Sequence, residues 1–509
     1  MTKYGRRLAR NASIVAGATL VSRLFGFARD VIVAFALGAG MFADAFFVAF
    51  RVPNLLRRLF AEGSLTMAFI PIYTRVREEE GEEAAHAMAR SAAMWLALIL
   101  GVVTVVVELA AGPLTFAIAP GFADNPELFG LTVRLVRICF PYIMLISGVA
   151  LCMGVLNASD RFLTPALAPV MLNVALIAAA LAAYGLDWNV AVGMSWGVLA
   201  GGVLQFALQQ PALTKSGFAW SGPRSWRNPA VRRMAILMLP TVFGAAVYQF
   251  NILFGTLLAS FLPEGSVSYL YYADRLVQFP LGVFGMAVST AALPRLSSLA
   301  AAGNMEDFNG SLRAALGLTL FICLPSMAGL MALADPIIAL LFQRGAFTGE
   351  AVRATASALL AYSWGLPFIA LSRPLVAAFY ALQDTKTPVK IAVACLAVNI
   401  GLGAALMPFW AHVGLAAAVS VSSAANFGLL LLFLGRATGT VPMPLSPALK
   451  CCLLSLGVYL AARWSVGGPV HWLAVIPVLA VLYIFAGHAL GMDEARMFAD
   501  IFRSRLRRS

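Results

Sequence analysis

The sequence predicts an all-α polytopic membrane protein of about fourteen transmembrane helices, built as two six-helix lobes and two C-terminal helices. The first observation is composition: only 12% of the 509 residues are charged and 61% are hydrophobic, whereas soluble domains carry about 25% charged residues. The second is that apolar runs of roughly 20 residues recur along the whole chain. The third is that motifs of the first half return in the second. The apolar runs are too many and too long for a soluble protein.

The predicted spans follow one another with short connections. In chain order they cover residues 11–37, 41–73, 91–111, 130–157, 163–184, 189–213, 234–261, 267–299, 311–333, 352–381, 388–408, 413–435, 446–464 and 470–490. The N-terminus is basic and then apolar, as in a signal peptide. Its apolar segment keeps charges in its middle and is longer than a signal core, so we expect an uncleaved first helix.

The basic residues alternate between connections, which sets the predicted orientation. The net charge of +13 comes mainly from basic clusters at 3–10, 215–233 and 496–508, whereas 112–127, 184–190, 260–266 and 408–413 contain no Lys or Arg. This alternation is the positive-inside pattern rather than a nucleic-acid surface. An even number of spans then predicts that both termini are cytoplasmic.

An internal repeat predicts the domain organisation. The stretch AFFVAFR, Ala45–Arg51, resembles YLYYADR, Tyr269–Arg275, at an offset of 224 residues. Six helices per half give both halves the same orientation in the membrane. The predicted parts are an N-lobe at 1–213, a cytoplasmic linker at 214–233, a C-lobe at 234–436, and helices 13 and 14 with a basic tail at 437–509.

Charged and polar residues interrupt several spans at membrane depth. They are Arg23, Arg29 and Asp30 in the first span, Asp44, Arg51, Asn54, Arg57, Arg58 and Glu62 in the second, Asp274 and Arg275 in the eighth, and Arg373 in the tenth. An arginine at a helix centre costs at least about 2.5 kcal/mol unless it faces protein, water or another charge. Seven arginines against four acids predict a cationic cavity for an anionic ligand, because the guanidinium fork suits phosphate and carboxylate.

Less specific interpretations stay open for single residues. Some of the charged residues could instead form ion pairs that only stabilise the fold, for example Arg29 with Asp44. Arg57 and Arg58 could instead lie near the cytoplasmic end of the helix and extend to the membrane surface. The sequence has no Walker motif, no C-x-x-C and only scattered histidines. We therefore expect a transporter rather than an enzyme, with no metal and no cofactor.

Several stretches resemble the MurJ/MviN lipid II flippases. They are SRLFGFARD from Ser22, ADAFFVAFRVPNLLRRLFAEG from Ala43, APGFAD from Ala119, YYADR from Tyr271 and QDTKTPVK from Gln383. The resemblance implies the multidrug/oligosaccharidyl-lipid/polysaccharide exporter fold, with a central cationic cavity and a groove for a lipid tail on helices 13 and 14. It implies alternating-access transport of lipid II, an undecaprenyl-pyrophosphate-linked peptidoglycan precursor, across the bacterial cytoplasmic membrane.

The resemblance also implies residue roles and partners. The important arginines of the family fall on Arg23, Arg29, Arg57 and Arg275, and Asp30, Asp44 and Asn54 match polar cavity positions; Arg51 joins this substrate-binding set by its place on the same helix. Partners are lipid II and membrane lipids, with a monomer in contact with cell-wall synthesis proteins. The acidic sodium ligands of some relatives are missing, so the coupling ion stays open. A polysaccharide-lipid flippase, a drug antiporter of the same superfamily and a scaffold protein are the alternatives.

Overall fold

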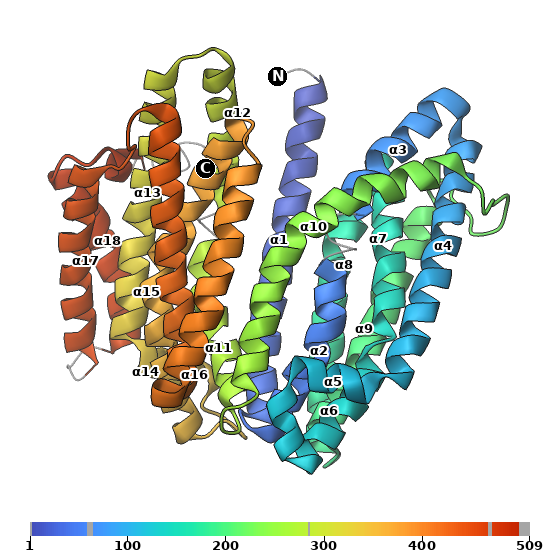
Figure 1. Cartoon of the computed structure of the whole chain (residues 1–509), viewed down its shortest axis with the longest axis horizontal. Helices are drawn as coiled ribbons and strands as arrows, with labels where there is room; N and C mark the ends of the chain where they lie inside the picture. The colour runs from blue at the N-terminus through green and yellow to red at the C-terminus, as the bar shows by residue number, and fades with distance from the viewer. Residues whose placement is uncertain (1–2, 59–64, 283–285, 467–470, 498–509) are drawn as a thin grey trace. The chain divides into compact units, whose positions relative to one another are not determined.

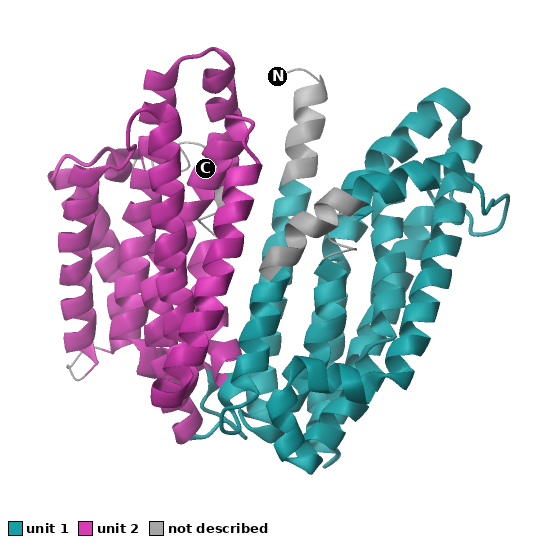
Figure 2. Cartoon of the chain, viewed as in Figure 1, with its two compact units in different colours: residues 1–268, 342–348 teal, residues 269–341, 349–509 magenta. Residues whose placement is uncertain are grey.

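The computed structural model describes residues 3–58, 65–282, 286–466 and 471–497, and every regular element in these ranges is a helix (Figure 1). The chain forms two compact units (Figure 2). Unit 1 contains residues 1–268 and 342–348, and unit 2 contains residues 269–341 and 349–509. The fold class predicted from composition and apolar runs is confirmed.

Unit 1 contains the first ten α-helices and one short 3₁₀ helix. They are α1 (Lys3–Leu37), α2 (Met41–Leu56), α3 (Leu65–Glu80), α4 (Glu82–Leu109), α5 (Ala111–Ile118), η2 (Pro120–Asp124), α6 (Pro126–Cys139), α7 (Tyr142–Ala158), α8 (Leu163–Gly185), α9 (Val190–Thr214) and α10 (Pro229–Ala259). Helices α8 and α9 pack along each other, and α8 also packs on α1. The segment 342–348 returns to this unit, where the Ala346 amide donates to the Phe35 carbonyl at 2.9 Å.

Unit 2 begins within α11 and contains the remaining helices. They are α11 (Ser266–Pro280), α12 (Met286–Ala301), α13 (Met305–Ala332), α14 (Ala334–Phe342), α15 (Gly349–Ala381), α16 (Lys386–Thr438), α17 (Leu445–Ser465) and α18 (Trp472–Ala489). A buried apolar core joins α13, α15 and α16, and includes Leu316, Leu375 and Leu430. The two C-terminal helices extend this unit, because α17 packs on α13 and α18 packs on α17.

Each predicted span has a helical counterpart, but the second, fourth and eighth are interrupted. The second is divided into α2 and α3, the fourth into α6 and α7 at Phe140–Pro141, and the eighth into α11 and α12. In contrast, α16 covers two predicted spans, which separate at Ala411, where φ is 47° and ψ is −130°. Within the described ranges, nine helical segments are long and apolar enough to cross a membrane. The total of about fourteen spans stays a prediction.

The internal repeat extends to the lengths of the helices. Helices α4 and α13 both have 28 residues and begin 223 residues apart. The segment Pro126–Ala158, which comprises α6 and α7, and helix α15 both have 33 residues and begin 223 residues apart. The predicted lobe boundaries at 213 and 234 follow this repeat and stay a prediction. The boundary set by packing comes later, after Ser268, because α10 packs on α3, α4 and α5 of unit 1.

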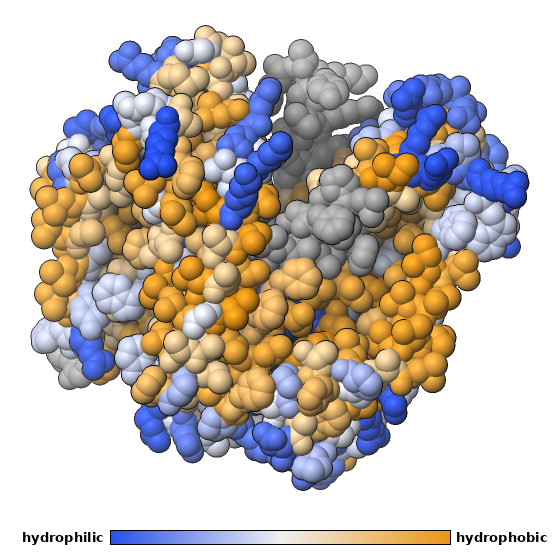
Figure 3. All heavy atoms as spheres, in the orientation of Figure 1, coloured by the Kyte–Doolittle hydropathy of each residue, from blue (hydrophilic) through white to orange (hydrophobic). Residues whose placement is uncertain are grey.

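The surface of each unit has the pattern of a membrane protein. Hydrophobic residues cover the middle of the helices, and hydrophilic residues gather at the helix ends (Figure 3). Helix α4 shows this at residue level, because Leu98, Val102, Val105 and Leu109 are all exposed. Their spacing of four, three and four residues places them on one helix face. In water such a face would be unfavourable, whereas in a bilayer it contacts lipid.

Candidate substrate-binding site

Arg29 lies at the centre of a polar cluster between α1 and α8. Its Nη2 and Nε donate to Asp30 Oδ1 at 2.7 and 3.1 Å, and its Nη1 donates to Asn173 Oδ1 at 3.1 Å. The Arg29 side chain is only 13% exposed. The cluster thus provides oxygen acceptors for a buried guanidinium, which is the condition for placing an arginine at membrane depth.

The same cluster ties the two helices together. Asn173 on α8 donates from Nδ2 to the Ser22 carbonyl on α1 at 3.4 Å. Gly26 lies beside it, and a methyl group there would come to 3.7 Å from Asn173 Nδ2, an ordinary contact distance. Helix α1 runs through Gly26 without a break. Residue 26 could therefore carry a methyl group without a clash, and the described helix shows no bend there.

Arg23 differs from Arg29 although both lie on α1. Arg23 is exposed, whereas Arg29 is mostly buried. The two residues are six positions apart, which turns them about 240° from each other on a helix. The structure therefore places one arginine of the pair mostly inside the protein and leaves the other exposed.

The arginines of α2 are oriented by neutral oxygen atoms. Arg51 Nη1 donates to Thr256 Oγ1 and to the Ile252 carbonyl on α10, the latter at 3.4 Å. Arg57 donates from Nη2 and Nε to Asn54 Oδ1 at 2.7 and 3.0 Å. Arg57 and Arg58 lie in a π-helical turn after α2 and are half-buried. Glu62 lies outside the described residues.

Asp44 holds a turn between helices. It is 1% exposed, and its carboxylate accepts from the Gly265 amide at 2.6 Å, from the Ser268 amide at 2.8 Å and from Ser268 Oγ. These donors lie at the start of α11, so the charge is favourably placed at a helix N-terminus. The carboxylate that contacts Arg29 is that of Asp30, the adjacent residue, rather than that of Asp44.

Arg275 is the site residue that lies in unit 2. Its Nη2 donates to Tyr271 Oη at 2.9 Å, and its guanidinium carbon is 4.9 Å from the centre of the Tyr271 ring. The neighbouring Asp274 accepts from Gln278 Nε2 at 3.3 Å. The four-residue spacing of Tyr271 and Arg275 on α11 makes this contact local.

The described contacts join several predicted residues to a neighbour. Arg29 pairs with Asp30, Arg57 bonds to Asn54, and Arg51 contacts α10. Among the residues that the structure describes, no group of His, Cys, Asp and Glu could hold a metal ion. The polar atoms of the site are suited to binding an anion through guanidinium groups.

Two important residues were not identified from the sequence. Asn173 is the amide partner of Arg29, and its signal was a lone polar residue in the apolar span 163–184. Arg90 is 4% exposed and lies one residue before the predicted span 91–111. Its position next to a predicted loop gave no sign that it would be buried.

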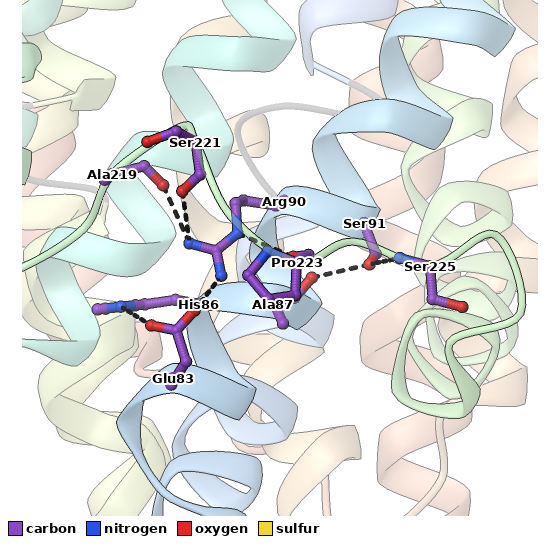
Figure 4. Close-up of polar contacts among 9 residues, drawn as sticks. All are labelled: Glu83, His86, Ala87, Arg90, Ser91, Ala219, Ser221, Pro223 and Ser225. Atoms are coloured by element: carbon purple, nitrogen blue, oxygen red, sulfur yellow. Dashed lines mark hydrogen bonds and ion pairs between the residues drawn. The ribbon is translucent and has the colours of Figure 1, made fainter.

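Arg90 fastens the chain between α9 and α10 onto α4 (Figure 4). We call residues 219–227 the strap. Arg90 Nε donates to the Pro223 carbonyl at 2.9 Å, and Nη1 donates to the carbonyls of Ala219 and Ser221 at 3.1 and 3.3 Å. Its Nη2 pairs with Glu83. The strap is thus bound through its main chain, within the segment predicted as a linker at 214–233.

Two further residues shape the strap. The Ser225 amide donates to Ser91 Oγ at 2.9 Å. Gly222 has a φ of 131°, and a methyl group there would lie 2.8 Å from the guanidinium carbon of Arg90. Both its backbone conformation and the close approach of Arg90 therefore favour glycine.

Comparison with known proteins gives consistent matches along the chain. The family model described as "Lipid II flippase MurJ" matches residues 33–486. A "Probable lipid II flippase MurJ" of Vibrio cholerae is 40% identical over 435 residues, which cover 84% of this chain and 82% of that protein. A "Lipid II flippase MurJ" of Burkholderia cenocepacia is 38% identical over 472 residues, which cover 92% and 90%.

Solved structures also match this chain. A structure described as "Lipid II flippase MurJ, inward closed conformation" matches with a TM-score of 0.79 and 28% identity, over 97% of this chain and 99% of that one. An inward-facing multidrug resistance MATE family transporter of the MOP superfamily matches with a TM-score of 0.70 at 15% identity, over 84% and 98%. At that identity the second match shows the fold alone.

Proposed function

Since the chain belongs to the MurJ lipid II flippase family, we propose that it carries lipid II from the inner to the outer leaflet of the bacterial cytoplasmic membrane by alternating access. The substrate combines an undecaprenyl chain, which stays in lipid, with a diphosphate and a sugar-peptide head. We propose that the head passes through a cationic cavity lined by arginines of α1, α2 and α11. Both chain termini then lie in the cytoplasm, as the positive-inside pattern predicts.

The observation that carries this proposal is the set of partners around Arg29. Its guanidinium donates to side-chain oxygens of Asp30 and Asn173. Side chains can rotate away, whereas main-chain carbonyls are fixed by the helix. A diphosphate offers several charged oxygens that suit the guanidinium fork. Arg29 can therefore exchange its present acceptors for the substrate without unfolding the helix.

The other arginines have partners that a diphosphate can replace. Arg57 bonds to the Asn54 amide oxygen and Arg275 to the Tyr271 hydroxyl. A phosphate can accept two parallel hydrogen bonds from a guanidinium and also carries the opposite charge, whereas the amide oxygen and the hydroxyl are neutral. The neutral partners thus orient the guanidinium groups and yield to a phosphate.

We assign Asp44 a different part in the cycle. Its carboxylate is occupied by the turn at Gly265–Ser268, so we propose that it latches α2 to the start of α11. Alternating access requires contacts that hold one state and release in another. Charge-assisted bonds to main-chain amides are strong enough for such a latch.

The test is depletion of the flippase in cells, followed by expression of this chain. We expect lipid II to accumulate on the inner leaflet during depletion and to be cleared by the native chain. The variant Arg29→Ala should reach the membrane in equal amount and leave the accumulation in place. Clearance by Arg29→Ala at native expression would contradict the proposed site, and failure of the native chain to clear lipid II would contradict the function.

A further inference from the structure

The strap lies at one end of the lipid-facing surface of α4. The exposed stripe on this helix runs from Leu109 to Leu98, and Trp95 follows one turn further toward the strap. From Leu109 to Trp95 the helix rises about 21 Å, which is most of the roughly 30 Å hydrocarbon thickness of a bilayer. The strap therefore lies where this surface leaves the hydrocarbon region.

An aromatic pair marks that level. The rings of Trp95 and Trp226 pack edge to face with their centres 5.2 Å apart, and Trp95 Nε1 donates to the Trp226 carbonyl at 3.1 Å. The Trp226 side chain is 55% exposed. Tryptophan is enriched at the membrane–water interface because one part of the ring is apolar and another donates a hydrogen bond. The two tryptophans lie where the apolar stripe ends, as the aromatic residues of membrane proteins do at the membrane–water interface.

Two arginines flank the exposed tryptophan. Arg224 and Arg227 are both exposed, and in the described part of the chain neither guanidinium donates a hydrogen bond or pairs with a carboxylate. Glu83, at the same end of α4, is engaged by Arg90. Along the axis of α4, the order is thus apolar stripe, tryptophan pair and arginines.

The strap holds these groups in place before any ligand binds. Its main chain is fixed by Arg90 at three carbonyls and by Ser91 at one amide (Figure 4). A segment held in this way loses little conformational freedom when it binds. A free linker of the same composition would have to be ordered first.

We propose that the strap is an interfacial anchor that binds the phosphate groups of anionic bulk phospholipids. Arg224 and Arg227 contact the phosphates, and Trp226 lies beneath them at the edge of the hydrocarbon. Basic residues next to a membrane segment attract anionic lipids in this way. The anchor fixes the depth of α4 and of the start of α10 at Pro229, two residues after the strap. It is separate from the transport of lipid II, so it goes beyond the proposed function.

The test measures lipid selectivity with the full chain in phosphatidylcholine vesicles that contain no lipid II. Spin-labelled phosphatidylglycerol or phosphatidylcholine is added in trace amount, and electron paramagnetic resonance gives the fraction of each lipid that the protein immobilises. We expect the native chain to prefer phosphatidylglycerol several-fold, and 1 M salt to reduce this preference because it screens exposed charges. Equal immobilisation of the two lipids by the native chain would overturn the proposal.

A matched pair of variants locates the effect. The double variant Arg224→Gln and Arg227→Gln should lose most of the preference. The control Arg295→Gln and Arg313→Gln removes the same charge from two exposed arginines of unit 2 and should keep it. An equal loss in both variants would show a general charge effect and overturn the assignment to the strap. All four residues are exposed, so unchanged melting temperatures verify that folding is preserved.

Discussion

Arg29 and Arg90 are two buried arginines of unit 1 that are held in different ways. Arg29 is 13% exposed at its side chain and bonds to the side chains of Asp30 and Asn173. Arg90 is 4% exposed at its side chain and bonds to three main-chain carbonyls of the strap as well as to Glu83. Asp30 and Asn173 are side chains that can rotate away from Arg29, whereas three acceptors of Arg90 are part of the backbone.

This difference separates a binding arginine from a structural one. A guanidinium that is satisfied by main-chain carbonyls fixes the course of the chain, and replacing it leaves several acceptors without their donor. A guanidinium that is satisfied by rotatable side chains can change partners when an anion arrives. We therefore expect substitutions of Arg29 to impair transport and substitutions around Arg90 to impair stability.

The largest effect is expected for Arg29→Ala, which should abolish the growth of cells that depend on this chain. The reason is loss of the guanidinium that we assign to the diphosphate. The conservative variant Arg29→Lys should also fail, because an ammonium lacks the planar fork. Growth is measured after depletion of the host flippase, with membrane levels checked by immunoblot. Normal growth of cells that carry Arg29→Ala would contradict the assignment of Arg29 to binding and Arg90 to structure.

The next effect is expected for Arg90→Ala, which should lower the free energy of unfolding by about 3 kcal/mol, because three main-chain carbonyls of the strap lose their donor. Thermal unfolding of purified protein measures this loss, and limited proteolysis should show new cleavage within the strap. The control is Arg75→Ala, which removes an exposed pair with Glu79 and should change little. A strap that stays resistant to protease in Arg90→Ala would contradict its clamping role.

A smaller effect is expected for Gly222→Ala. The added methyl group would be strained at φ 131° and would meet the guanidinium carbon of Arg90, so the loss should be about 2 kcal/mol. Gly112→Ala serves as the control, because nothing lies within 4 Å of the added group. Melting temperatures of the two variants give the comparison. Equal stability of both would argue against close packing of the strap on Arg90.

The smallest effect is expected for Ser91→Ala, which removes the acceptor of the Ser225 amide. One hydrogen bond of this kind contributes about 1 kcal/mol. Ser357→Ala is the matched control, because Ser357 Oγ bonds only to the Arg353 carbonyl of its own helix. Hydrogen exchange at the Ser225 amide should rise in Ser91→Ala and stay unchanged in the control. Unchanged exchange in both variants would contradict the contact.

The sequence predicted the helices well because apolar runs decide them. It did not predict the division of the second span into α2 and α3, or the joining of two spans in α16, since both depend on local breaks rather than hydropathy. At the site, the charges at Arg29 and Asp30 were visible as exceptions in an apolar run. Their partner Asn173 lies more than 140 residues away, and no periodic pattern relates the two.

Arg90 shows why the strap was expected to be only a linker. Its acceptors are main-chain carbonyls, which every residue carries and which therefore leave no mark in a sequence. Gly222 and Pro223 are typical of any loop. The strap became recognisable only when tertiary contacts placed its backbone against α4.

Binding of lipid II to purified protein tests the central distinction most directly. Native chain, Arg29→Ala and Arg90→Lys are compared in detergent micelles, with affinity expressed per folded molecule and melting temperature measured in parallel. We expect Arg29→Ala to lose at least about tenfold in affinity per folded molecule, the scale for one charge-assisted contact. Arg90→Lys should melt earlier and bind as the native chain does. Native affinity in Arg29→Ala, or lost affinity in folded Arg90→Lys, would contradict the account.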